Sequence, residues 1–229
     1  MRIRELAKVP GGVRNMSLAI GIPLPVNALA QNQTIFNQLI KRAAAGDIAA
    51  FEQIMIHSQQ RVMAMAWRML GNEADARDAS QEVFLRVYKH LGGFRQNEDF
   101  FAWLYTITVN VCRDVSKKRQ RHHDQFTSLE GSTGEAAFAV ASEQVNAEDA
   151  FVITQQRELI AKAMATLPDK ERASIVLRDV EGLATDEVAR IMKSSSTTVR
   201  SQISSARKKI KIYCEQYLKR NERGESHEL

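Results

Sequence analysis

Carboxylates recur at helical spacing in the segment "DARDASQEVFLRVYKHL". Asp75, Asp78 and Glu82 stand at positions i, i+3 and i+7, so a helix would place them on one face with Gln81 beside them. Paired carboxylates can perform acid–base catalysis or bind a divalent cation. The sequence shows no nucleophile, third ligand or phosphate-binding loop beside them, and its five histidines lack metal-ligand spacing. We therefore expect a polar or docking face, with no enzyme activity, metal or cofactor.

A second constellation lies near the C-terminus, in "LATDEVARIMKSSSTTVRSQISSARKKI". A short helix capped by Thr185, a turn, and a second helix capped by Thr197 or Thr198 would form a helix-turn-helix. The second helix would bury one narrow apolar stripe, made of Val199, Ile203, Ala206 and Ile210. Another face gathers groups that suit base edges and phosphates: Arg200, Ser204, Arg207, Lys208 and Lys211. A solvated basic helix at the end of a bundle is the alternative.

Both constellations need helices to position them, and the composition favours helices. The chain has only 11 glycines and 4 prolines in 229 residues, and no set of strands is apparent. Asp47 and Asn72 are expected to cap two of the helices. The net charge of +5 suits an acidic partner, and two distant cysteines indicate a reducing, cytoplasmic setting. We predict an all-α protein.

The predicted helices form two groups, separated by a change in composition. No lysine or arginine occurs between Arg121 and Arg157, where carboxylates and small polar residues typical of a flexible linker accumulate. We expect the N-terminal residues to form a flexible extension. Their basic residues followed by an apolar run mimic a signal peptide, and Met16 is an alternative initiation site. We expect an extension (1–30), a first helical domain (31–122), an acidic linker (123–146), a helix-turn-helix domain (147–220) and a tail (221–229).

The C-terminal unit resembles the promoter-reading domain of bacterial sigma factors of the extracytoplasmic-function type. The resemblance rests on Leu167-Pro168, on "LRDVEGL" and on "TVRSQISSARKKI", which follow the family's order and spacing. It implies that the second helix binds the upstream promoter element through Thr198, Arg200, Ser201, Ser204, Arg207, Lys208 and Lys211. Lys193 and Thr197 replace glycines usual in the family, and Gln202 replaces a common arginine. We expect these departures to alter promoter preference more than the fold.

The carboxylate helix resembles the same family's polymerase-docking helix, whose pattern is "D-x-x-Q-E-x-F". Asp78, Gln81, Glu82 and Phe84 match that pattern, and Asp75 lies on the same helical face. The resemblance implies that these five residues bind the clamp of the β′ subunit of core RNA polymerase. A polar, acidic face suits a reversible interface with a basic partner.

The segment "FRQNEDFFAWLYTITVNVCRDVSKKRQRH" is similar to the family's promoter-melting helix. The resemblance implies that an amide reads an unpaired base of the downstream element while cations hold the strand's phosphates. The residues implied are Phe94, Asn110, Arg113, Lys117, Lys118, Arg119 and Arg121. We expect Phe101, Trp103 and Leu104 to be mainly core residues.

Three motifs in the family's order identify the chain as a member, over roughly residues 34–120 and 145–215. We therefore expect a cytoplasmic alternative sigma factor that binds core RNA polymerase through the β′ clamp and β flap and binds promoter DNA. It is expected to serve a stress or envelope response under an anti-sigma factor, with no small-molecule substrate. A helix-turn-helix regulator without polymerase docking, which would not need the "DASQEVF" helix, and a protein-binding helical adaptor are the alternatives.

Overall fold

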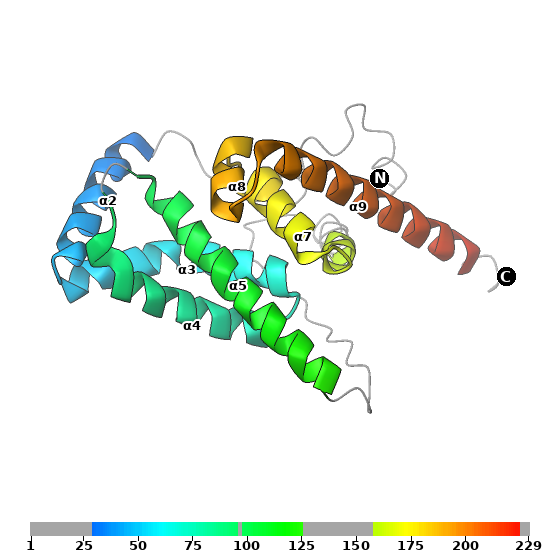
Figure 1. The fold of residues 1–229 in the computed structure, drawn as a ribbon, viewed down its shortest axis with the longest axis horizontal. Helices are drawn as coiled ribbons and strands as arrows, with labels where there is room; N and C mark the ends of the chain where they lie inside the picture. The colour runs from blue at the N-terminus through cyan, green and yellow to red at the C-terminus, as the bar shows by residue number, and fades with distance from the viewer. Residues whose placement is uncertain (1–28, 96–97, 126–157, 225–229) are drawn as a thin grey trace, which may run out of the picture.

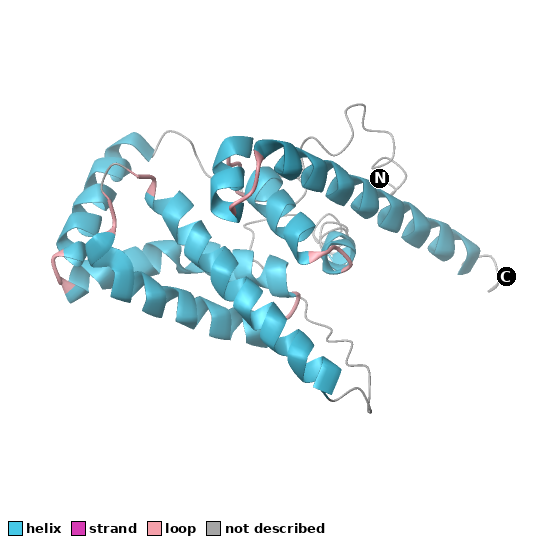
Figure 2. Cartoon of the chain, in the orientation of Figure 1, coloured by secondary structure: helices cyan, strands magenta, loops and turns pink. Residues whose placement is uncertain are grey.

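The computed structural model describes residues 29–95, 98–125 and 158–224, and within these ranges the regular elements are all helical (Figure 2). The all-α prediction is therefore confirmed for the described part of the chain. Most of the predicted extension, most of the acidic linker and the last five residues lie outside these ranges. Their expected properties and the domain boundaries stay predictions.

The first domain is a bundle of four long helices. They are α2 (Leu29–Ala44), α3 (Ile48–Leu70), α4 (Glu73–His90) and α5 (Phe100–Gln125), with the 3-10 turn η3 (Leu91–Gly93) after α4. Helix α3 packs against the other three, and α4 also packs against α5 (Figure 1). The aliphatic faces of α3, α4 and α5 meet inside the bundle, and Ile54, Val83 and Leu104 are fully buried there.

Side-chain caps and one glycine set the boundaries of α3 and α4. The Asp47 Oδ1 atom accepts a hydrogen bond from the Ala50 N–H at 3.0 Å, so the predicted cap of α3 is confirmed. The Asn72 Oδ1 atom accepts from the Asp75 N–H at 2.7 Å, which confirms the predicted cap of α4. Gly71 ends α3 at a φ of 76°, a left-handed conformation that costs glycine little because it lacks a Cβ atom.

The second domain contains the predicted helix-turn-helix. Residues 158–165 are helical, and the labelled elements are α7 (Asp169–Ile175), the π-helical segment η4 (Val176–Val180), α8 (Thr185–Met192) and α9 (Ser196–Gly224). Helices α8 and α9 pack against each other, and α9 also packs against α7. Helix α9 continues well past the rest of the domain toward the C-terminus (Figure 1).

The cap of α9 differs from the prediction. The Ser195 Oγ atom accepts a hydrogen bond from the Thr198 N–H at 3.1 Å, so Ser195 caps the helix, not Thr197 or Thr198. Several adjacent hydroxyl residues are all suitable caps, and the sequence could not choose among them. Burial of Val199 against the domain fixes where the first turn begins.

The start of α8 also differs. Thr185 was expected to cap this helix, but it is the first helical residue, and Ala184 occupies the cap position. The Glu187 Oε2 atom accepts a hydrogen bond from the Ala184 N–H at 2.7 Å, so a carboxylate in the first turn satisfies the free backbone donor. The predicted burial of Val188 and Ile191 is confirmed.

The two domains are in direct contact in this structure. Helix α5 lies against α8, and α3 lies against α7 and η4. Figure 1 shows the helix-turn-helix domain seated over the side of the bundle that α3 and α5 form. Tyr105 of α5 is buried and contacts Glu181 of the second domain, a contact that the sequence did not predict.

The turn between α8 and α9 generates a prediction about stability. Lys193 ends α8 at a φ of 50°, the one positive φ of a non-glycine residue among the described residues. Left-handed backbone costs an L-residue roughly 1–2 kcal/mol. Lys193→Gly should therefore raise the free energy of unfolding by about 1 kcal/mol, net of glycine's extra freedom in the unfolded chain, as measured by urea denaturation followed by circular dichroism.

Lys193→Ala is the matched control, because it removes the same charge and keeps the Cβ atom. Its stability should stay within about 0.5 kcal/mol of the parent. Equal stabilities of the glycine and alanine variants would show that the left-handed turn carries no strain.

Candidate nucleic-acid and polymerase interfaces

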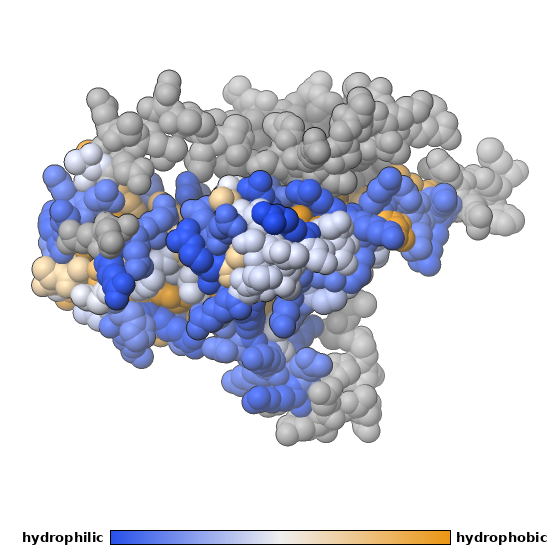
Figure 3. Space-filling view, turned by 45° about the horizontal axis from the view of Figure 1, so that its top comes forward, coloured by the Kyte–Doolittle hydropathy of each residue, from blue (hydrophilic) through white to orange (hydrophobic). Residues whose placement is uncertain are grey.

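Helix α9 presents a polar face to solvent and an apolar face to its own domain. The predicted stripe of Val199, Ile203, Ala206 and Ile210 is buried, as expected. The exposed residues along the first half of the helix include Thr197, Thr198, Arg200, Ser201, Ser204, Lys208 and Lys211. Lys209 is also exposed, and its Nζ atom donates a hydrogen bond to Glu171 at 2.9 Å. Figure 3 shows pale and blue side chains, with little orange, near the start of α9. Cations and short hydroxyl groups on one helical face are the set that phosphates and base edges require.

Arg207 stands apart from that exposed set. Its Nε and Nη2 atoms donate hydrogen bonds to the two carboxylate oxygens of Asp179 at 2.8 and 2.6 Å. The Asp179 side chain is only 8% exposed, and its hydrogen bonds raise the pKa of Arg207 above its ordinary value. The DNA contact of Arg207 stays a prediction, and it would have to be made by a guanidinium that is already bound to Asp179 within the domain.

Gln202 also turns toward the domain. Its Oε1 atom accepts a hydrogen bond from the Ser174 hydroxyl at 2.7 Å, and Ser174 is fully buried on α7. A buried hydroxyl needs such a partner, because an unsatisfied one costs about 1–3 kcal/mol. Gln202 was expected to affect a DNA contact, and the structure gives it a role in joining α9 to α7.

The exposed face of α4 is both polar and apolar. Asp78 and Gln81 are exposed on it as the docking prediction requires, together with Leu85 and Tyr88, each 55% exposed. Leu85 and Tyr88 were not among the residues predicted from the docking motif. Their signal was present in the sequence, since both fall out of phase with the buried valines of the same helix.

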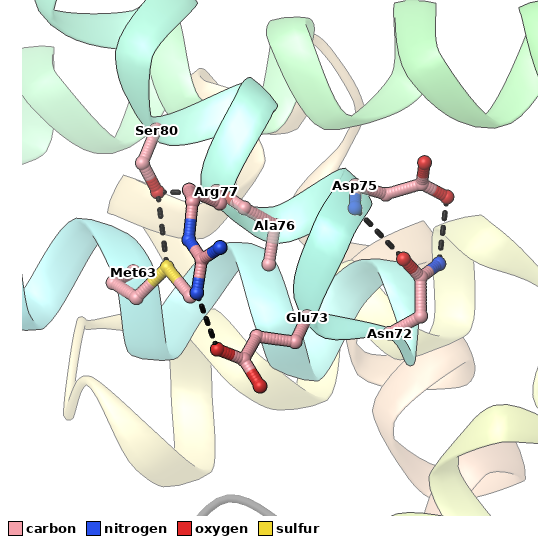
Figure 4. Close-up of polar contacts among 7 residues, drawn as sticks. All are labelled: Met63, Asn72, Glu73, Asp75, Ala76, Arg77 and Ser80. Carbon is pink, nitrogen blue, oxygen red and sulfur yellow. Dashed lines mark hydrogen bonds and ion pairs between the residues drawn. The ribbon is translucent and has the colours of Figure 1, made fainter. Parts of the chain in front are cut away.

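The first turn of α4 is fixed by local hydrogen bonds (Figure 4). Asn72 both accepts from the Asp75 N–H and donates from Nδ2 to the Asp75 carboxylate at 2.6 Å. Glu73 accepts a hydrogen bond from Arg77 at 2.7 Å, one turn along the helix. The Asp75 carboxylate also lies 3.6 Å from the Arg119 guanidinium of α5. Asp75 is thus a half-buried link between helices.

Two further predicted docking residues are engaged within the bundle. Glu82 accepts a hydrogen bond from Arg86 at 2.7 Å, and Arg86 also donates to Asp114 of α5 at 3.2 Å. The hydrogen bond with Glu82 is the main cause that raises the pKa of Arg86 above its ordinary value. Phe84 is half-buried and packs against the core. Of the five predicted docking residues, Asp78 and Gln81 are therefore the most available to a partner.

Helix α5 carries the predicted strand-binding residues along its C-terminal half. Asn110, Lys117 and Arg121 fall within about 40° of arc, with Asn110 half-exposed and the two cations exposed. Lys118 and Arg119 are also exposed, at about 80° and 180° around the helix from Asn110. An amide followed by a line of cations along one face is suited to an unpaired strand.

Two other predicted strand-binding residues have partners. The Arg113 Nη2 atom lies 3.1 Å from the Met192 Sδ atom of α8, so the second domain covers this end of the polar face. The Phe94 ring packs against Phe100 and Trp103, with centroid distances of 5.7 and 5.1 Å. Residues 96–97 of the neighbouring loop lie outside the described residues, so the predicted base pocket stays a prediction.

Among the described residues, we looked for side chains that could bind a metal ion or undergo redox chemistry. Over residues 29–95, 98–125 and 158–224, no three His, Cys, Asp or Glu side chains are grouped to hold a metal ion. Burial raises the pKa of the Cys112 thiol to about 12, which keeps it protonated and unreactive. Within the same ranges no helix has the length and apolar character that crossing a membrane requires.

Comparisons with known proteins match both halves of the chain. Residues 55–122 match the family described as Sigma-70 region 2, and residues 157–210 match Sigma-70, region 4. The RNA polymerase sigma-H factor of Pseudomonas aeruginosa is 29% identical over 175 residues, covering 76% of this chain and 90% of that protein. The ECF RNA polymerase sigma-E factor of Escherichia coli K12 is 31% identical over 174 residues, with coverages of 75% and 90%.

Two solved structures share the fold. One is CnrH in complex with the cytosolic domain of CnrY, with a TM-score of 0.54, 23% identity and coverage of 79% of this chain and 97% of that one. The other is the sigma factor RpoE of Bartonella quintana in complex with the anti-sigma factor NepR, with a TM-score of 0.57, 20% identity and coverages of 72% and 96%.

The ion pair of Arg207 generates a stability prediction. Asp179→Asn keeps the shape of the side chain but removes the charge that holds the guanidinium. Because a hydrogen bond to a charged group contributes about 1.5–3 kcal/mol, we expect the free energy of unfolding to fall by about 2 kcal/mol. Urea denaturation of the full chain measures this change.

Asp186→Asn is the matched control, because Asp186 is an exposed carboxylate of the same domain and the hydrogen bond that it accepts from Ser196 can be kept by the amide oxygen of asparagine. Its effect should stay within about 0.5 kcal/mol. An equally small effect of Asp179→Asn would mean that Arg207 is free to bind DNA.

Proposed function

This chain belongs to the extracytoplasmic-function family of RNA polymerase sigma factors, and we propose how its exposed helix faces divide the work of that family. As an alternative sigma factor, the protein binds core RNA polymerase and directs it to promoters to initiate transcription. Its relatives are initiation factors, which supply recognition while the polymerase supplies catalysis. The observation that carries the proposal is that α4, α5 and α9 each expose a chemically different polar face.

Helix α4 is proposed to dock on the β′ clamp of core polymerase. Asp78 and Gln81 supply polar contacts, and the exposed Leu85 and Tyr88 supply apolar surface in the same patch. Interfaces typically combine a small apolar centre with a polar rim, and the charged rim accelerates association with a basic partner. The β flap is proposed as a second contact, made by the helix-turn-helix domain.

Helix α5 is proposed to bind the unpaired strand of the downstream promoter element. Asn110 can donate to and accept from a base edge, while Lys117 and Arg121 neutralise phosphates along the same face. Arg113 completes the set when it is released from Met192. Base edges become accessible only when the strands separate, so this face acts after the duplex has opened.

Helix α9 is proposed to enter the major groove of the upstream promoter element. Its buried stripe holds it against α7 and α8, which leaves Arg200, Ser201 and Ser204 facing outward near its N-terminal end. The N-terminal residues of such a helix reach base edges, and more distal cations such as Lys208 reach phosphates. Because both domains must engage one promoter through one linker, the distance between the two elements is restricted.

Regulation by an anti-sigma factor is also proposed, in a stress or envelope response in the cytoplasm. Support comes from the family and from a relative named for a complex with the anti-sigma factor NepR. The alternative of a helix-turn-helix regulator without polymerase docking does not account for the match to Sigma-70 region 2 over residues 55–122.

Run-off transcription tests the proposed function as a whole. Purified chain is added to core RNA polymerase on a library of genomic promoter fragments, and transcripts are compared with those of core polymerase alone. We expect promoter-specific transcripts and co-elution of the chain with core polymerase in gel filtration. Absence of both would overturn the proposal.

The docking face yields a specific prediction. Asp78→Lys places a cation at the centre of the exposed face of α4, and we expect affinity for core polymerase to fall about tenfold or more. Fluorescence anisotropy of labelled protein titrated with core polymerase measures the affinity. Asp78 is preferred to Glu82 for this test, because replacing Glu82 would also remove the hydrogen-bond partner of Arg86.

Glu52→Lys is the control for Asp78→Lys, since it makes the same charge change at an exposed position on α3. It should leave the affinity within about twofold of the parent value. Equal losses in the two variants would assign the effect to net charge and contradict the docking face.

The recognition helix yields a second prediction. Lys208→Ala should weaken promoter binding of the polymerase complex and reduce the slope of log affinity against log salt by about 1, as expected for one lost phosphate contact. Arg200→Ala should instead alter the preference among promoter sequences, because Arg200 lies near the end of α9 that faces the bases.

Binding assays on a panel of upstream-element variants at several salt concentrations separate the two effects. Lys162→Ala, at an exposed cation outside the recognition helix, is the control and should change neither quantity. An unchanged salt slope for Lys208→Ala would place the phosphate contacts elsewhere.

A further inference from the structure

A buried polar cluster joins the two domains. The Tyr105 hydroxyl of α5 donates a hydrogen bond to the Glu181 Oε2 atom at 2.6 Å, and Glu181 follows η4 in the other domain. Tyr105 is only 3% exposed. Burial, reinforced by the nearby Glu181 charge, raises the pKa of Tyr105 far above its ordinary value, so the hydroxyl remains a donor.

Arg68 of α3 completes this cluster. Its Nη1 atom lies 3.9 Å from the Glu181 Oε1 atom, and the two side chains are only 10% and 12% exposed. Burial lowers the pKa of Arg68, while the charge of Glu181 opposes that shift. Desolvation offsets most of the attraction within a buried ion pair, and both groups regain water if the domains part. The cluster therefore defines one relative position of the two domains, but the free energy needed to separate its groups is small.

A second cross-domain contact lies at the end of α3. The Arg172 Nη1 atom donates to the Met69 carbonyl oxygen at 2.6 Å, and its Nη2 atom donates to the carbonyls of Ala165 and Leu167 at 2.9 and 2.7 Å. Arg172 thus caps the C-terminal end of α3 and the end of the helix before α7. A cation is favoured at a helix C-terminus, where carbonyl groups lack partners.

These contacts have opposite effects on the two functional faces of the first domain. Helix α8 lies against α5, and the Arg113 guanidinium contacts Met192 of α8. In that position the Arg113 Nη2 atom is directed at a sulfur atom and the guanidinium is half-buried, so it is less available to a phosphate. The docking residues Asp78 and Gln81 on α4 remain exposed in the same arrangement. The docked second domain thus leaves polymerase docking open and occupies part of the strand-binding face.

We propose that the docked arrangement is an autoinhibited state of the free protein, held by the Tyr105–Glu181–Arg68 cluster. In this state the chain binds polymerase through α4 but withholds Arg113 from single-stranded DNA. Strand binding requires the helix-turn-helix domain to leave α3 and α5, which also frees it to reach a separate DNA segment. The gating step rests on the proposed role of Arg113, whereas the docked state itself does not.

Small-angle X-ray scattering tests the docked state without DNA or polymerase. The parent protein should show the radius of gyration of two domains in contact, and the double variant Tyr105→Phe/Glu181→Gln should show a larger one. Circular dichroism verifies that the helices remain folded. A parent protein that already scatters as two separate domains would overturn the proposal, and this result does not depend on any variant.

Binding of a fluorescein-labelled single-stranded oligonucleotide of mixed sequence tests the gating. If the open state is a minority in the parent, the double variant should bind about fivefold or more tightly, because apparent affinity scales with the fraction of competent molecules. Adding Arg113→Ala to the double variant should remove most of this gain.

Tyr217→Phe/Glu52→Gln is the matched control, because it makes the same two chemical changes at exposed positions on α9 and α3. It should alter neither the radius of gyration nor the oligonucleotide affinity. A larger radius with unchanged affinity in the double variant would overturn the gating. Unchanged values of both, with helices intact, would overturn the proposal as a whole.

Discussion

Each functional helix of this protein is held in place by burial of its opposite face. Most helical stability in a protein comes from packing of an apolar face, so α4, α5 and α9 depend on their apolar stripes for order. Buried aliphatic residues such as Val83, Leu104 and Ile203 each contribute about 1.5–3 kcal/mol to that order. The opposite faces are thereby held rigid and are mainly polar, with Leu85 and Tyr88 as apolar residues on α4. Polymerase and DNA binding are accordingly proposed for these remaining surfaces.

The same constraint divides the charged residues into two groups. Cations at the edge of a buried stripe find partners within the fold, as Arg207 does with Asp179 and Arg172 does with helix-end carbonyls. Cations in the middle of the free face, such as Lys208 and Lys117, have side chains open to solvent. A basic helix therefore offers fewer DNA contacts than its composition suggests. Angular position relative to the buried stripe decides which residues these are.

The interface between the domains differs in character from the core of either one. It contains the polar and charged side chains of Tyr105, Glu181 and Arg68, all nearly buried, whereas most of the buried side chains in the two domains are aliphatic. An aliphatic interface resists separation because each opening exposes apolar surface to water. A paired polar interface defines one geometry, and its groups are hydrated again on opening. That character suits a contact that forms in the free protein and separates on a promoter.

The sequence by itself determined the all-α class, the helix-turn-helix, the capping by Asp47 and Asn72, and the family, because helical periodicity, caps and motif order are local properties. Only the tertiary structure decided which hydroxyl caps α9, that Arg207 and Gln202 turn inward, and that Tyr105 meets Glu181. Apart from the cap, these contacts join residues 28 to 76 positions apart. No local pattern encodes such a pairing, since it depends on how helices pack and what that packing buries.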